Sequence, residues 1–112
     1  MGYKKKNYAF VLVRDTGLTL YGQWINLDEG QLWDDNAAAL SASTTWVNSK
    51  VAISELGVGR HYLVSIPKDL QDGRWHFNVF IQAGADPAST DEYDSGQEGL
   101  IMAGAWCRKA MA

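Results

Sequence analysis

The chain has 112 residues, of which 46% are hydrophobic and 21% charged, and its formal net charge is −3 at pH 7. These values are typical of one globular domain and exclude general disorder, while the negative charge does not favour nucleic acid or anionic lipid as a partner. One cysteine, Cys107, excludes an internal disulfide. No apolar run approaches the roughly 20 residues of a membrane-spanning helix, and no stretch near the N-terminus has the apolar length of an export signal. We expect one domain over residues 1–112, with the basic arm 1–6 and the tail 105–112 at its periphery.

The first half of the chain predicts short strands separated by turns. Residues 8–13 are apolar on both faces and rich in β-branched and aromatic side chains, as in a strand that is buried on two sides. Residues 18–25 and 31–33 predict two further strands. A single helical turn is expected over residues 37–40, and the alternation over residues 46–56 predicts a half-exposed strand.

The clearest element is expected to be a hairpin over residues 60–84. Apolar residues alternate with polar ones along both of its arms, a period that indicates strands rather than a helix. The apolar set is Tyr62, Val64, Ile66, Trp75, Phe77, Val79 and Ile81. This pattern predicts that the seven side chains share one buried face of the hairpin.

The last quarter of the chain is polar and rich in turn residues over 83–98, which predicts a loop. Residues 100–103 predict a final strand, and residues 105–112 fit either a frayed strand or a short helix. Six to eight short strands with at most one or two helical turns indicate an all-β protein. We expect a single antiparallel β-sandwich, with a small barrel as the alternative.

Residues 62–91 also carry a family resemblance. The motif reads Tyr62-x-x-x-Ile66-Pro67, then Gly73-x-Trp75-x-Phe77-x-Val79, then Gly84-Ala85-x-Pro87 and Asp91. It resembles small immunoglobulin-like or transthyretin-like β-sandwich modules in structural proteins of tailed bacteriophages and prophages. The resemblance implies a non-catalytic component of the virion that contacts other virion proteins or copies of itself. It brings no active-site residue and no cofactor.

Acidic residues gather in the predicted loop, at Asp86, Asp91, Glu92, Asp94 and Glu98. Calcium prefers several oxygen ligands from one loop, so this segment is the best metal candidate. An EF-hand is excluded, because an EF-hand register that starts at Asp91 places Met102 where the bidentate glutamate belongs. A solvated loop is the favoured interpretation, and a looser calcium site stays open.

Paired carboxylates for glycoside hydrolysis are disfavoured because a domain of this size gives little room for a deep cleft, and a thiol–imidazole pair is the other catalytic arrangement to consider. It would combine Cys107 with His61 or His76, but no flanking signature of a nucleophile accompanies them. We therefore expect no catalytic residue, no metal and no cofactor.

Five tryptophans are many for this length. Trp24 and Trp75 are in phase with apolar neighbours, which predicts that they belong to the core. The other three lie at element ends beside polar residues and are candidates for partner binding or sugar stacking; they are Trp33, Trp46 and Trp106.

The outer face of the predicted hairpin is a second candidate for partner binding. It carries His76 and Asn78, and Phe80 interrupts its polar pattern. An apolar side chain on a polar face indicates that either a second layer of the same chain or a partner subunit covers it.

Two functions fit these observations. The first is a virion assembly protein, such as a capsid decoration or a tail, neck or fibre module, that acts through protein–protein contacts. The second is a carbohydrate-binding or adhesion module that uses surface tryptophans. An enzyme is the least favoured alternative.

Overall fold

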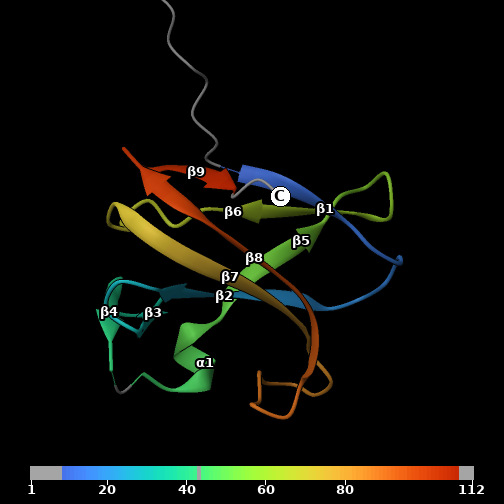
Figure 1. Ribbon diagram of the computed structural model, residues 1–112. Helices are drawn as coiled ribbons and strands as arrows, with labels where there is room; N and C mark the ends of the chain where they lie inside the picture. Colours follow the sequence, from blue (N-terminus) through green and yellow to red (C-terminus); the bar gives the residue numbers. More distant parts are fainter. Residues whose placement is uncertain (1–8, 43, 109–112) are drawn as a thin grey trace, which may run out of the picture.

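The computed structural model describes residues 1–112 except 1–8, 43 and 109–112, and it consists almost entirely of antiparallel strands (Figure 1). The elements are β1 (Ala9–Val13), β2 (Leu20–Asn26), β3 (Gln31–Asp34), β4 (Ala39–Ser41), α1 (Trp46–Ser49), β5 (Val51–Glu55), β6 (His61–Ser65), β7 (Gly73–Ile81), β8 (Glu92–Met102) and β9 (Ala105–Arg108). The expected all-β class is therefore confirmed.

All the strands belong to one sheet, in the order β1-β6-β5-β2-β7-β8-β9, and β3 and β4 extend it beside β2. Strand β2 is the centre of this arrangement, because it pairs with β7 along its whole length and with β5 and β3 near its two ends. The sheet curls until β1 comes back towards β8, so that it forms a nearly closed barrel (Figure 1).

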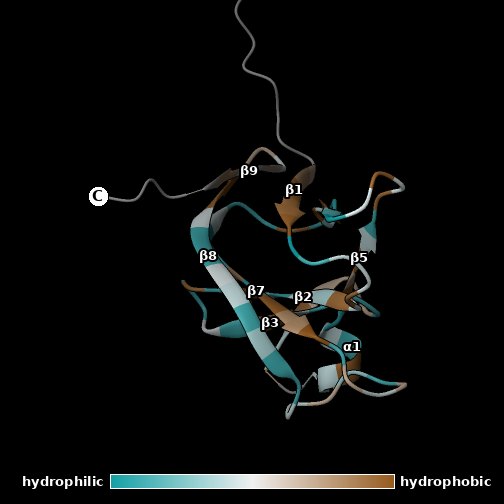
Figure 2. Ribbon diagram, turned by 90° about the vertical axis from the view of Figure 1, so that its right-hand side faces the viewer, coloured by the Kyte–Doolittle hydropathy of each residue, from teal (hydrophilic) through white to brown (hydrophobic). Residues whose placement is uncertain are grey.

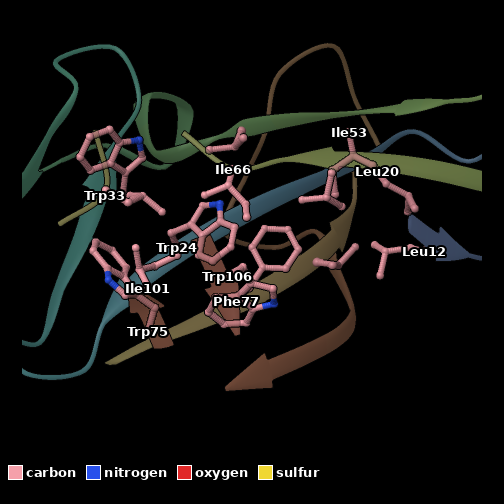
Figure 3. Close-up of a cluster of buried hydrophobic side chains, with 14 of the residues drawn as sticks. Leu12, Leu20, Trp24, Trp33, Ile53, Ile66, Trp75, Phe77, Ile101 and Trp106 are labelled. Carbon is pink, nitrogen blue, oxygen red and sulfur yellow. The ribbon is translucent and has the colours of Figure 1, made fainter. Parts of the chain in front are cut away.

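The inside of the curl is filled by aromatic and aliphatic side chains (Figure 3). The rings of Trp24 and Phe77 are 4.4 Å apart, and Trp24 meets Trp106 edge to face at 5.1 Å. Trp24 and Trp75 are fully buried, which confirms their predicted place in the core. Gly22 makes this packing possible, because a Cβ there would lie 2.2 Å from Cε1 of Phe77.

The predicted hairpin over residues 60–84 is wrong in its pairing, although six of its seven apolar side chains are buried as expected and Ile81 is half-buried. In the described chain, β6 pairs with β1 and β5, and β7 pairs with β2 and β8. The connection between them carries Leu70, which is buried in the core, and its Gln71 carbonyl accepts a hydrogen bond from Trp75. Alternation indicates which face of a strand is buried, but it does not identify the neighbouring strand.

The helical turn is also displaced from its expected place. Residues 35–38 form the turn between β3 and β4, so that residues 39 and 40 already belong to β4, and the Asp34 carboxylate stabilises this turn by accepting the backbone N–H of Ala37. The helix is α1, capped by the Thr45 hydroxyl, which accepts the N–H of Asn48. The strand expected over residues 46–56 therefore begins only at Val51.

The polar segment 83–98 is a loop only in its first part, since β8 starts at Glu92 and runs for eleven residues. It pairs with β7 throughout, with a β-bulge opposite Val79 and Phe80. Ala103 and Gly104, with φ angles of 51° and 79°, form the tight turn into β9. Residues 105–108 are thus a strand, and residues 1–6 and 109–112 of the two expected peripheral segments lie outside the described residues.

Candidate functional site

Phe80 lies on the outer face of β7, as expected, but it is only 8% exposed. Its ring stacks on Tyr21 at 5.6 Å and meets Trp46 and Tyr93 edge to face at 5.2 Å and 5.7 Å. Helix α1 therefore covers Phe80 as a second layer of the same chain, while Tyr21 and Tyr93 flank it on the neighbouring strands β2 and β8. Of the two explanations that the sequence left open, a second layer of the same chain or a partner subunit, the structure shows the first.

Hydrogen bonds tie this second layer to the sheet. The indole N–H of Trp46 donates to the Tyr21 hydroxyl at 2.8 Å, and that hydroxyl donates to the Asp91 carboxylate at 2.6 Å. Asp91 also accepts the backbone N–H groups of Ala83 and Ala88. Asp91 is thus the anchor of the loop between β7 and β8.

The same contacts shift two pKa values in opposite directions. Burial, followed by the hydrogen bond to Asp91, raises the pKa of Tyr21 to about 12. The Tyr21 hydroxyl and then the N–H of Ala88 hold the pKa of Asp91 below its usual value, because both stabilise the carboxylate. Tyr21 is therefore a neutral donor and Asp91 an ionised acceptor over the neutral range.

The acidic residues of the segment 86–98 do not converge on one point. Asp91 is engaged by Tyr21, and Asp94 forms an ion pair with Arg14 at 2.5 Å. Among the described residues, no three His, Cys, Asp or Glu side chains come together as a set of metal ligands. Hydrogen bonding and ion pairing within the chain therefore account for the carboxylates of Asp91 and Asp94.

The three tryptophans expected at the surface do not offer exposed platforms. Trp33 is buried, and its indole N–H donates to Asp35 at 3.0 Å. Trp106 is buried on the inward side of β9, opposite Ile101. Trp46 is half-buried against Phe80. The polar neighbours of these residues lie on the opposite side of each strand or in the adjoining turn, so the expectation of exposure was wrong for Trp33 and Trp106.

His76 and Asn78 do lie on the open outer face of β7, and both are half-buried. They meet Tyr93 of β8 above Gly96. A Cβ built on Gly96 would lie 2.4 Å from the Tyr93 hydroxyl, 2.6 Å from Nε2 of His76 and 3.1 Å from Oδ1 of Asn78. Three polar atoms therefore gather around one spot, and the sequence did not indicate Tyr93 because its segment read as a loop.

The barrel has a seam where β1 approaches β8. In the described chain β1 pairs only with β6, and β9 covers β8 only over residues 99–102. Side chains cross the gap: Arg14 bonds to Asp94 and, at 2.7 Å, to the Ser95 hydroxyl. A hollow of about 300 Å³ lies here, lined by residues 11–14 and 95–97.

Exposed apolar side chains lie on β1, at one wall of the seam, and on the end of β8 that pairs with β9. Val11 and Val13 on β1 are 48% and 52% exposed, which corrects the expectation that this strand is buried on two faces. Leu100 and Met102 are exposed on β8. In Figure 2 β1 is uniformly hydrophobic, beside β9 and the end of β8. We call Val11, Val13, Leu100 and Met102 the seam face.

A comparison of the chain with protein-family models, with curated proteins and with solved structures gives no match in any of the three. Helix α1 is four residues long. Among the residues that the structure describes, no helix is long and apolar enough to cross a membrane.

Proposed function

We propose that this chain is a non-catalytic assembly protein that associates with further copies of itself through the seam face. The observation that carries the proposal is the exposure of Val11 and Val13 on a strand that, among the described residues, pairs with β6 alone. Strands at the edge of a sheet are usually protected by charged residues, proline or a covering element. Contiguous exposed apolar side chains mark protein interfaces.

A second copy is the occupant that the charges favour. The chain is acidic, with a formal net charge of −3, so random contacts between copies are repulsive. Strand β1 has no charged side chain between Ala9 and Val13, and Leu100 and Met102 at the end of β8 are also apolar. Two seam faces can therefore meet without placing like charges opposite each other.

The proposal that the assembly is a phage virion is more specific. The resemblance of residues 62–91 to phage modules supports a virion component, as a capsid decoration or a tail, neck or fibre module. Within the all-β class, it also supports an immunoglobulin-like or transthyretin-like sandwich, in which the two sides of the curled sheet serve as the two layers.

Sedimentation velocity over a concentration series tests the association. Val11→Lys and Val13→Lys each place a charge on the seam face, and Val58→Lys is the matched control because Val58 is 81% exposed in the turn before β6. We expect the seam variants to dissociate at least tenfold more easily, which follows from the roughly 1.5 kcal/mol that burial of a valine contributes. A wild-type chain that stays monomeric would contradict the proposal, as would equal effects of all three variants.

A saccharide site is the second candidate, and the cluster above Gly96 favours it. Tyr93 is 55% exposed and lies beside His76 and Asn78, a combination of an aromatic ring with polar groups that suits a hydroxyl-rich ligand. Glycan-array binding that Tyr93→Ala abolishes and Val58→Ala preserves would support it. Absence of binding would exclude this second candidate.

A further inference from the structure

We infer that two copies of the chain pack face to face through the outer face of β1, β6 and β5, with a two-fold axis along β6. We call this surface the sheet face; it consists of the outward side chains of Ala9–Val13, His61–Ser65 and Val51–Glu55. The inference rests on the proposed function, because it specifies how the copies associate. Val11 and Val13 belong to both surfaces, whereas Leu63 and Ser54 belong to the sheet face alone.

The three strands present their outward side chains in level rows. They are neighbours in the sheet (Figure 1), and Val11 is opposite Leu63, which in turn is opposite Ser54. Opposite residues of antiparallel strands share a face, and alternate residues of a strand point the same way. Val11 and Ser54 are exposed and Leu63 is half-buried between them, so these three form the middle row. By the same register, Ala9 and Ala52 lie at the two ends of the next row.

The sheet face carries almost no charge. Its three strands contain one charged residue, Glu55, although 21% of the chain is charged. Glu55 ends β5, and its carboxylate accepts the backbone N–H groups of Gly17 and Arg60 within the chain. The solvated face of an antiparallel sheet normally carries polar side chains, so a face of alanine, valine, leucine and serine indicates that a partner covers it.

The charge of the whole chain makes a second copy the partner that fits this face. The formal net charge is −3, so copies that meet at charged surfaces repel each other. Two cations at the border of the sheet face are engaged within the chain, because Lys50 donates to Gln82 at 3.1 Å and Arg14 pairs with Asp94. Two sheet faces can therefore meet without burying a charge, and this complementarity directs the copies to one another.

The sizes of the side chains select the arrangement of the two copies. A symmetric face-to-face pair has its two-fold axis in the plane of the interface. An axis along β6 puts β1 of each copy over β5 of the other, at the same level. Val11 then faces Ser54, and Leu63 meets Leu63 of the second copy on the axis. An axis across the strands would instead set Val11 against Val11 and Ser54 against Ser54, a tight contact beside a gap, which packs less well.

Cross-linking through single cysteines tests the position of the axis. In a Cys107→Ser background, Leu63→Cys places a thiol on the axis, and Ser54→Cys, the matched control on the neighbouring strand, places one away from it. A short bis-maleimide should join Leu63→Cys chains into covalent dimers and leave Ser54→Cys chains mostly unlinked. Equal yields, or a higher yield from Ser54→Cys, would overturn the inference.

A pair of opposite charges tests which strands face each other. Val11→Glu and Ser54→Lys should each weaken association about tenfold in sedimentation velocity, because each buries a charge without a partner. The double variant should return to within about threefold of the wild type, because its two charges meet across the interface. Within one copy these positions are separated by β6, about 10 Å apart. Both positions are exposed, so the fold should persist, which circular dichroism checks.

The control for the charge pair combines Ser54→Lys with Val58→Glu, which lies in the turn before β6 and should not restore association. Strictly additive losses in the Val11→Glu, Ser54→Lys chain would overturn the inference. If Val13→Lys weakens association but the charge pair gives no rescue, the proposed function stands and the sheet-face arrangement is wrong. A wild-type chain that stays monomeric at every concentration removes both.

Discussion

Replacement of Phe80 by alanine tests whether this residue belongs to the fold or to an interface. Truncation of a buried phenylalanine typically costs about 3–5 kcal/mol, and each aromatic pair contributes about 0.5–1.5 kcal/mol beyond the buried area. Phe80 is 8% exposed and has three aromatic neighbours, but it lies in an outer layer that can partly relax around the loss. We therefore expect a cost near the lower limit, about 3 kcal/mol.

Urea unfolding followed by tryptophan fluorescence and circular dichroism measures this cost. With a slope of about 2 kcal/mol per molar urea, the midpoint should fall by about 1.5 M. Phe80→Leu should lose about a third as much, because it keeps most of the apolar volume, and Val58→Ala should change stability by less than about 0.5 kcal/mol. A cost below about 1 kcal/mol for Phe80→Ala, combined with weaker association, would refute the structural role and restore Phe80 to the interface.

Three further predictions concern the core and the hydrogen-bonded anchor. Gly22→Ala should destabilise the chain by about 2–3 kcal/mol because its Cβ collides with Phe77, and Phe77→Leu in the same chain should recover part of this loss in a double-mutant cycle; strictly additive costs would argue against the contact. The raised pKa of Tyr21, about 12, means that its contribution to stability is complete below pH 10 and is lost as the pH rises towards 12, which alkaline unfolding of the wild type against Tyr21→Phe would detect. The lowered pKa of Asp91 has the opposite sign: its contribution is present above the ordinary value of 3.8 and is lost as the pH falls through the lower folded value. Asp91→Asn should therefore flatten the acid side of the stability profile, and an unchanged profile would contradict the assigned anchor.

The buried faces of the strands could be predicted from the sequence, but their neighbours could not. Alternation correctly placed Trp24, Trp75 and Phe77 in the core. The hairpin over residues 60–84 failed because the same alternation is equally satisfied by pairing with β1, β5, β2 or β8. That choice is made by packing between residues far apart in the chain.

Strand β8 was missed for a related reason. Its first half contains Asp94, Ser95 and Gly96, residues that disfavour strands when considered singly. Pairing with β7 along nine positions outweighs this preference. The cluster of Tyr93 with His76 and Asn78 depends on that pairing, so it could not be derived before β8 was known.

Phe80 interrupts the polar face that alternation predicts for this strand, and the sequence left two explanations open. The structure shows that a second layer of the same chain covers Phe80. The seam, in contrast, had no signal in the sequence. An apolar run such as residues 9–13 reads as a strand buried on both faces. Only the closure of the barrel reveals that Val11 and Val13 are outside it.

The central claim, association through the seam face, is tested most directly by hydrogen exchange on the wild-type chain at low and high concentration. We expect protection at high concentration to appear over residues 9–13 and 100–102, with no change over residues 57–60 in the turn before β6. Protection confined to another surface, or exchange that does not depend on concentration, would contradict the account.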